Sequence, residues 1–226
     1  IAELLSSGAG VLAVCSDASR RAALATGAAG LARFNGGTGQ VACGRCGGGV
    51  VEGLAKRAAS GLALTDYAAL ECAPALAAEF SHVVLVDPPA SAREARLAAN
   101  GFGYLHPVWT EAERAFALSV LGERYPQRGA IKAQFEALRE AGKAEGVALR
   151  RALEGSGAQP LSPEVAARCL RVLTELKLVR GKPNGGTGSV GVVSSKGTDL
   201  ERSNAFRAYG ARYEEGQRYL ERPQQP

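Results

Sequence analysis

The amino-acid sequence predicts an α/β first part followed by an α-rich second part. Two short apolar runs, Gly10–Cys15 and His82–Asp87, have the length and the β-branched content of buried strands. Ser16 and Asp17 follow the first run and are typical helix-capping residues, so a strand leads directly into a helix, as in an α/β unit. From Thr110 onward, apolar residues recur with the spacing of amphipathic helices.

Length and charge support this division. A chain of 226 residues can form one large domain or two small ones, each with its own core. Residues 1–107 contain eight Lys or Arg and eight Asp or Glu, whereas residues 108–226 contain nineteen and fourteen, so the net charge of +5 lies in the second part. A basic part favours nucleic acid or an acidic peptide as partner, although solvated helix faces give the same composition. We expect an α/β subdomain over residues 1–109 and a helical, basic subdomain over residues 110–226.

Composition also indicates the cellular setting. The chain has no apolar run of about twenty residues and no signal peptide, which predicts a cytoplasmic protein without a membrane partner. Five cysteines, sparsely spread, fit a reducing compartment better than a disulfide framework. Because the sequence begins at Ile1 and contains no Met, we expect it to be a fragment of a longer protein.

Five further segments complete the expected first part. Helices are expected after the first strand to about Gly27, over Val51–Ala59 and over Ser91–Asn100. Strands are expected over Gly61–Thr65 and Gly103–Val108.

A glycine-rich stretch surrounds the one CxxC motif. Residues 36–49 contain seven glycines around Cys43 and Cys46. A CxxC can be half of a zinc site or a redox dithiol. Zinc needs two more ligands, and Cys72 and His82 could supply them only if the fold happened to bring them there. A redox dithiol normally begins a helix, which the three glycines after the motif oppose. We therefore expect a loop or hairpin, and no metal ligands.

The first part is not expected to carry out nucleotide chemistry. Asn35–Gly39 superficially resembles a phosphate loop, but the string GxxxxGK[ST] occurs nowhere in the chain. The same five residues recur at Asn184–Gly188, which makes a turn the simpler interpretation of both copies. Asp87 ends a strand where a helicase-like domain places its Mg²⁺-holding carboxylate, yet Pro88 follows it rather than a second acid. We interpret this part as a degenerate RecA-like sheet in which Asp87 caps a turn.

The two histidines, His82 and His106, do not predict a catalytic site. His106 precedes a proline and has no acidic or Cys neighbour, which favours a packing or hydrogen-bonded role. Two separated histidines form neither a clustered Asp/His metal site nor a Ser-His-Asp triad. We expect no catalytic residue in this chain.

In the second part, helices are expected over Thr110–Gly122, Gln127–Ala141 and Glu145–Leu153. Ser162 can cap the next helix, and Pro163 suits its first position.

This last helix is expected to run to about Leu178. Its apolar residues form one stripe, made of Val165, Cys169, Val172, Leu173 and Leu176. Glu164–Arg168 and Arg171–Glu175 are expected as i,i+4 ion pairs on its exposed face. A glycine-rich hairpin follows over Val179–Val193, and a helix followed by such a hairpin is the outline of a winged helix.

The C-terminal segment Asn204–Leu220 is rich in arginine and tyrosine. Alternating Arg and Tyr side chains could bind a nucleic-acid strand by stacking and charge. The alternative is a helix whose tyrosines pack against the domain.

Three segments resemble the C-terminal domain of RecJ, the bacterial exonuclease specific for single-stranded DNA. They are Leu170–Val179, the glycine-rich hairpin and Lys196–Ser203. The resemblance covers most of the chain, weakly before Glu71 and best after His82. It implies that the whole protein degrades single-stranded DNA from 5′ to 3′ in recombination and repair, with Mn²⁺ or Mg²⁺ in a catalytic core outside this chain. It implies no cofactor in the chain itself.

The role that the resemblance leaves to this chain is docking. The favoured partner is the acidic, apolar C-terminal tail of single-stranded-DNA-binding protein (SSB), because RecJ proteins act on SSB-coated DNA. A repair helicase and single-stranded DNA are further candidates. The cations expected to bind the partner are Arg171, Lys177, Arg180, Lys182, Lys196 and Arg202. Arginine suits carboxylates because its planar fork can bond bidentately.

Two other functions remain open from the sequence. A winged-helix module could contact nucleic acid directly, although Arg168 and Arg171 are expected to be paired and no Asn/Gln/Arg cluster faces base edges. A small nucleotide hydrolase would need the phosphate loop that the sequence lacks.

Overall fold

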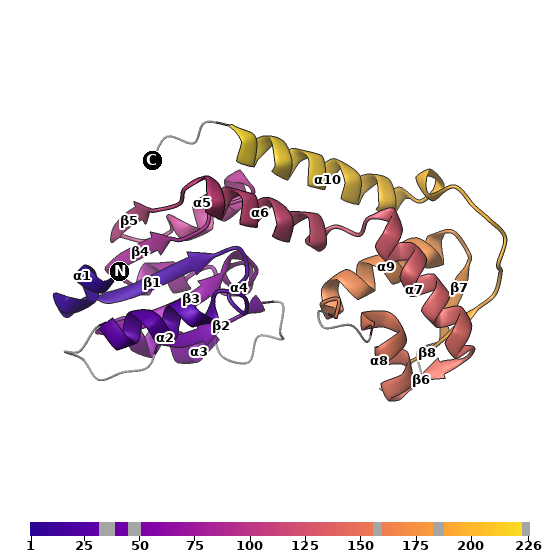
Figure 1. Ribbon diagram of the computed structural model, residues 1–226, viewed down its shortest axis with the longest axis horizontal. Coiled ribbons are helices and arrows are strands. Elements are labelled where there is room, and N and C mark those ends of the chain that lie inside the picture. Colours follow the sequence, from indigo (N-terminus) through magenta and orange to yellow (C-terminus); the bar gives the residue numbers. More distant parts are fainter. Residues whose placement is uncertain (32–38, 45–50, 156–159, 183–187, 223–226) are drawn as a thin grey trace. The chain divides into compact units, whose positions relative to one another are not determined.

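Figure 1 shows the computed structural model of the chain, which describes residues 1–31, 39–44, 51–155, 160–182 and 188–222. The chain divides into two compact units. Unit 1 consists of residues 1–120 and 216–226, and unit 2 of residues 121–215. The sequence-based division instead follows residue 109 and assigns the C-terminal segment to the second part.

Unit 1 is built on a parallel five-stranded sheet in the order β2-β3-β1-β4-β5 (Figure 1). The strands are β1 (Gly10–Cys15), β2 (Gln40–Ala42), β3 (Gly61–Asp66), β4 (His82–Leu85) and β5 (Tyr104–Pro107). The α/β class predicted from the sequence is confirmed. Strand β1 lies between β3 and β4 and is buried along its whole length, which is why it reads as a continuous apolar run.

Helices cover the two faces of this sheet. They are α1 (Ala2–Ser6), α2 (Ala22–Leu31), α3 (Val51–Leu54), α4 (Tyr67–Cys72) and α5 (Ala92–Ala98), and α6 (Glu111–Arg124) begins in unit 1 after β5. Because strand side chains alternate, Leu12 and Val14 enter one hydrophobic cluster, whereas Val11 and Ala13 enter the other. The sheet therefore has a core on both faces.

Two helix predictions in unit 1 are wrong in their bounds. Helix α2 begins at Ala22 rather than directly after Asp17, because the Asp17 carboxylate accepts hydrogen bonds from the backbone N–H groups of Ser19 and Arg20 and holds a turn there. The helix expected over Val51–Ala59 is α-helical only to Leu54 and continues as a 3₁₀ turn over Ala55–Arg57.

Unit 2 contains a small antiparallel sheet of strand order β6-β8-β7 together with helices. From residue 128 to residue 192 its elements are, in chain order, α7 (Arg128–Ala141), β6 (Ala144–Glu145), α8 (Gly146–Glu154), α9 (Pro163–Glu175), β7 (Val179–Lys182) and β8 (Ser189–Val192). Its core joins Ile131 and Leu138 of α7 to Val172 of α9 and to Val179 and Val190 of the sheet. Strand β6 was not predicted, since two residues are too short to show a strand period.

Helix α9 confirms the sequence prediction except at its end. Ser162 accepts a hydrogen bond from the N–H of Val165, Pro163 is the first helical residue, and the predicted stripe is buried apart from the half-buried Leu176. The predicted end at Leu178 is wrong, because Lys177 adopts φ +58° and reverses the chain.

Two further elements follow the sheet of unit 2. They are the 3₁₀ turn η4 (Leu200–Arg202) and α10 (Asn204–Glu221), which confirms a helix in the Arg- and Tyr-rich segment. In unit 1, the 3₁₀ turn η3 (Leu76–Glu79) precedes β4. Most of the predicted turns at Asn35–Gly39 and Asn184–Gly188 lies outside the described residues. Across the described parts of the chain, no helix has the length and apolar character needed to cross a membrane.

Candidate functional site

Buried polar side chains of unit 1 gather where the parallel strands end. Ser16 and Asp17 follow β1, Asp66 ends β3, and Asp87 follows β4 by two residues; all four side chains are buried. Strand β1 leads to β2 on one side of the sheet, and its neighbour β4 leads to β5 on the other. In open α/β sheets, ligands bind outside the carboxyl ends of two strands whose connections diverge in this way. This edge is therefore the first candidate site.

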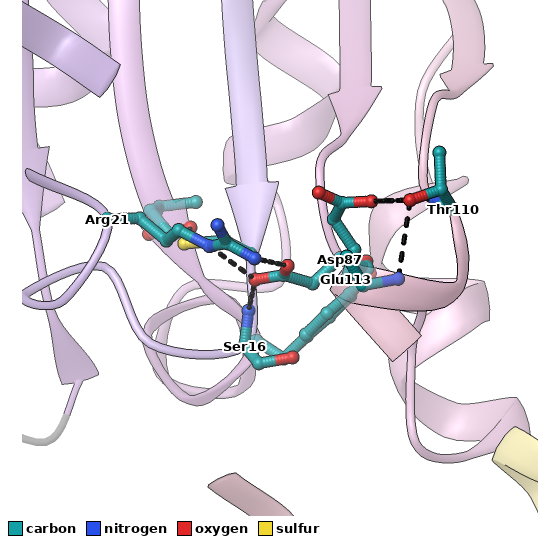
Figure 2. A network of polar contacts seen from close by, with 9 residues as sticks. Ser16, Arg21, Asp87, Thr110 and Glu113 are labelled. Atoms are coloured by element: carbon teal, nitrogen blue, oxygen red, sulfur yellow. Dashed lines mark hydrogen bonds and ion pairs between the residues drawn. The ribbon is translucent and has the colours of Figure 1, made fainter. Parts of the chain in front are cut away.

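Asp87 is held from several directions at this edge (Figure 2). Its Oδ2 accepts a hydrogen bond of 2.9 Å from the backbone N–H of Ser16, and its Oδ1 lies 2.5 Å from Nη2 of Arg21. The guanidinium of Arg21 also lies 4.2 Å from the ring centroid of Phe116. Tyr67 donates its hydroxyl proton to the carbonyl oxygen of Asp87. The carboxylate thus joins β1, β4 and the turn before α2.

Burial raises the pKa of the Asp87 carboxyl, although the hydrogen bonds from Arg21 and Ser16 oppose the rise. A raised pKa in the folded state means that the folded chain binds this proton more tightly than the unfolded chain. The contribution of Asp87 to stability therefore falls as the pH rises from its unfolded pKa through its raised folded value. Ionisation of Asp87 therefore costs stability relative to the protonated carboxyl, and the hydrogen bonds from Arg21 and Ser16 reduce this cost.

Asp66 connects three segments and is fully buried. It caps α4 by accepting from the N–H of Ala69 at 2.9 Å, and it also accepts from the N–H groups of Gly44 at 3.0 Å and Ala18 at 3.3 Å. A Cβ at Gly44 would lie 2.4 Å from the backbone nitrogen of Ala69, so only glycine fits this close approach. The glycine inside the CxxC motif is explained by this packing.

One group of three donors at this edge could hold a metal ion. Asp17, Cys43 and Asp66 each offer a ligand atom, and these atoms lie within 4.8 Å of one another. A thiolate with two carboxylate oxygens is a mixed set of soft and hard ligands. Both carboxylates already accept hydrogen bonds, Asp17 from Ser19 and Asp66 from three backbone N–H groups. These capping hydrogen bonds explain why the two carboxylates lie here. The second cysteine of the motif, Cys46, lies outside the described residues.

The two histidines, expected to be separate, lie side by side on β4 and β5. The register pairs His82 with Tyr104 and brings His106 next to Val84. Nδ1 of His82 lies 3.0 Å from Nε2 of His106, and the rings of His82 and Tyr104 stack with centroids 5.4 Å apart. The hydrogen-bonded role expected for His106 is confirmed.

The second candidate site is the set of cations predicted in unit 2. Arg171 lies in α9, Arg202 in η4, Lys177 directly after α9, and Lys196 after β8. Arg180 lies in β7 with Lys182, whose side chain is outside the described residues. The other five side chains are exposed.

Three of these cations lie around one junction. The carbonyl oxygen of Leu178 accepts a hydrogen bond from the N–H of Ser194 at 3.4 Å, which joins the start of β7 to the segment after β8. Lys177, Arg180 and Lys196 each lie within two residues of this contact. Their side chains form no ion pair or hydrogen bond with any residue that the structure describes.

Arg171 takes part in a different contact, and Arg202 directly precedes Ser203, which also takes part in it. Arg171 forms the predicted pair with Glu175, with Nε 3.3 Å from Oε1. The other oxygen of Glu175 accepts from Ser203 Oγ at 2.8 Å and from the N–H of Ala205 at 2.9 Å, and these bonds lower the pKa of Glu175. Of the predicted cations, Arg171 is therefore paired with an acid, whereas Lys177, Arg180 and Lys196 have no such partner among the described residues.

Arg168 has a structural role. It forms the predicted pair with Glu164 and lies over the rings of Tyr125 and Tyr209, with Cζ 5.1 and 5.9 Å from their centroids. The packing of Tyr209 in the core of unit 2 supports the helix interpretation of the C-terminal segment over a stacking role for this residue.

A comparison of the chain with known protein families, curated proteins and solved structures found no match. The resemblance of Leu170–Val179 and Lys196–Ser203 to RecJ proteins therefore stays a prediction.

Proposed function

We propose that this chain is a non-catalytic docking part of a cytoplasmic RecJ-like exonuclease, and that unit 2 binds the acidic C-terminal tail of SSB through a winged-helix-like fold. In support, the unit contains in chain order a helix, a short strand, two helices and two antiparallel strands, an order that a winged helix also has, and in this proposal β7 and β8 belong to the wing. Metal-dependent DNA cleavage, with Mn²⁺ or Mg²⁺, belongs in this proposal to a core outside this chain.

The observation that carries the proposal is the junction at Leu178 with three cations that form no ion pair among the described residues. Unit 2 contains sixteen Lys or Arg and eleven Asp or Glu, whereas unit 1 contains eleven of each, so the excess charge of +5 belongs to unit 2. An exposed cation without an acidic partner is free to bind a carboxylate of another molecule. Lys177, Arg180 and Lys196 meet this condition among the described residues.

The junction also offers an apolar contact. Val193 directly precedes Ser194 and is 54% exposed. A tail that ends in an apolar side chain and carries carboxylates would find both kinds of contact within a few residues. Interfaces of this type combine an apolar centre with a charged rim.

Unit 1 contributes no chemistry in this proposal. Asp87, which stands where a RecA-like domain holds its metal-binding acid, is bonded to Arg21 and Ser16. This arrangement supports a degenerate RecA-like sheet that serves as a scaffold.

The proposal is tested by titrating the chain with a fluorescent SSB tail peptide. Arg180→Glu should weaken binding at least about tenfold, since a shielded charge-assisted contact contributes roughly 1.5–3 kcal/mol and reversal adds repulsion. Arg150→Glu is the matched control, because Arg150 is also exposed but lies in α8. Equal losses in the two variants, or no affinity for the peptide, would refute the SSB site.

Direct binding of nucleic acid by the same cations is the alternative function. The same exposed cations support this function, because Lys and Arg bind phosphates as well as carboxylates. A labelled single-stranded oligonucleotide titrated in parallel distinguishes the two, because counterion release makes DNA affinity fall steeply with salt. Tight, salt-sensitive DNA binding lost in Arg180→Glu, without peptide affinity, would assign the surface to nucleic acid.

A further inference from the structure

Exposed apolar side chains of unit 1 are concentrated on one edge of its sheet. Four of the seven large hydrophobic residues that are exposed in the described parts of the chain lie between positions 102 and 108. They are Phe102, Tyr104, Leu105 and Val108. Strand β5 within this segment is the last strand of the sheet and pairs only with β4 (Figure 1).

The backbone on both sides of Phe102 packs closely against neighbouring segments. A Cβ at Gly101 would lie 2.9 Å from the carbonyl oxygen of Ala77, and a Cβ at Gly103 would lie 2.3 Å from that of Ser81. Real Cβ atoms do not approach so closely, so both flanking residues must be glycine. The segment is held tightly against its neighbours while Phe102 remains fully exposed. An exposed aromatic side chain in a rigid segment is typical of an interaction surface.

The free edge of β5 has a defined pattern of hydrogen-bonding groups. Tyr104 donates its N–H inward to the carbonyl of Ser81, directly before β4, at 2.8 Å, and Val108 donates its N–H to that of Leu85 in β4 at 3.1 Å. In a parallel ladder, alternate residues face the neighbouring strand, so Leu105 and Pro107 turn their main-chain groups outward. Leu105 offers an N–H and a carbonyl, whereas Pro107 offers only a carbonyl. Donors are thus at the start of the free edge and acceptors toward its end.

We propose that β5 pairs with β5 of a second copy of this chain, antiparallel and with Leu105 on the two-fold axis. Each Leu105 N–H then donates to the Leu105 carbonyl of the other copy. Each Gly103 N–H donates to the Pro107 carbonyl of the other copy, so the missing N–H of Pro107 costs one ladder bond on each side. In an antiparallel pair the start of one strand lies opposite the end of the other, so the donors of each copy face the acceptors of its partner. Antiparallel self-pairing therefore suits this edge.

The same register also matches the side chains. Residues whose numbers add to 210 lie opposite one another, which places Phe102 opposite Val108 and Tyr104 opposite His106 of the other copy. All four side chains lie on one face of the joined sheet, because strand side chains alternate. The Tyr104–His106 contact would extend the ring stack that Tyr104 already forms with His82.

A second copy fits this edge better than other occupants. Unit 1 contains eleven basic and eleven acidic residues, so it lacks the positive charge with which stacked rings bind a nucleic-acid strand. An unrelated strand would need to match the outward pattern, whereas the chain itself supplies a match at each opposed pair from 102 to 108.

Sedimentation equilibrium of the full chain over about 1–100 µM tests the proposal. We expect a reversible dimer for the unmodified chain. Phe102→Glu and Val108→Lys should each weaken self-association at least tenfold, since each places two charges against apolar partners. A mixture of the two variants should dimerise again, because the heterodimer pairs the introduced glutamate with the introduced lysine and the unchanged Phe102 with the unchanged Val108.

The matched control is Val193→Lys. Val193 and Val108 are both 54% exposed, but Val193 lies in unit 2. This variant should dimerise as the unmodified chain does. A chain that remains monomeric at every concentration, a dimer insensitive to Phe102→Glu, or a mixture that fails to associate would overturn the proposal.

A cross-link provides a second measurement. Leu105→Cys in a Cys72→Ser background should form a disulfide-linked dimer under mild oxidation, because hydrogen-bonded antiparallel partners have Cα atoms about 5.5 Å apart, within disulfide range. Leu24→Cys, at another exposed apolar position in α2, should not. Equal cross-linking at both positions would contradict the register. Binding of a single-stranded oligonucleotide by a monomer, abolished by Phe102→Glu, would assign the edge to nucleic acid instead.

Discussion

The two units use their charged residues differently. In unit 1, Asp66 and Asp87 are fully buried, and both carboxylates bond groups from distant segments. In unit 2, Lys177, Arg180 and Lys196 are exposed and form no ion pair among the described residues. The buried charges hold loops in place, so removing them should cost stability. The exposed charges contribute little to folding and are available for a partner.

The largest expected effect is that of Asp66→Ala. Three backbone N–H groups, of Ala18, Gly44 and Ala69, would lose a charged acceptor in a buried site, which should reduce the free energy of unfolding by about 3–5 kcal/mol. Asp199→Ala is the control, because Asp199 caps η4 on the surface and its loss should cost about 1 kcal/mol or less. Urea denaturation measures both. Similar losses would mean that burial of the cap is unimportant.

A smaller effect is expected from Arg21→Ala. The change leaves the Asp87 carboxylate buried without its cation, and we expect a loss of about 2–3 kcal/mol together with a further rise in the pKa of Asp87. Arg171→Ala, which breaks the exposed pair with Glu175, should cost about 0.2–1 kcal/mol. Denaturation at pH 5 and pH 8 tests both, and the cost of Arg21→Ala should be greater at the higher pH. An equal cost at the two pH values would show that Arg21 does not affect the titration of Asp87 between them.

The smallest expected effect is a gain in stability rather than a loss. Lys177 occupies the left-handed position that ends α9, where Leu178 N–H bonds the carbonyl of Leu173, and glycine is favoured there. Lys177→Gly should therefore stabilise the chain by about 0.5–1 kcal/mol while weakening peptide binding. Lys177→Ala should weaken binding equally without this gain, because it keeps a Cβ at positive φ. A stabilisation by Ala as large as that by Gly would refute the explanation from backbone conformation.

The sequence predicts those elements that are identified by residues close together in the chain. Helix α9 has a capping serine, a proline at its first position and a complete apolar stripe, and β1 and β4 are apolar runs bounded by polar residues. Strands β2 and β6 are too short for a period to be visible. The end of α9 was misplaced because nothing in the residue type of Lys177 indicates a positive φ.

The candidate sites are less predictable, because they depend on contacts between distant segments. Asp66 precedes Tyr67 without the acidic partner three residues later that would mark a capping box, so its role was missed. The contact between Asp87 and Arg21, and that between His82 and His106, arise only from the strand order and register. The ion pairs of α9, in contrast, follow from i,i+4 spacing and were predicted correctly.

Pro107 has a consequence for the behaviour of the chain at high concentration. An exposed, apolar edge strand is a template on which extended chains can assemble one after another. A strand added in parallel along β5 would find no N–H donor at Pro107, the last residue of β5, so the ladder would lose a hydrogen bond there. The chain can therefore display an apolar edge while limiting its growth into fibrils.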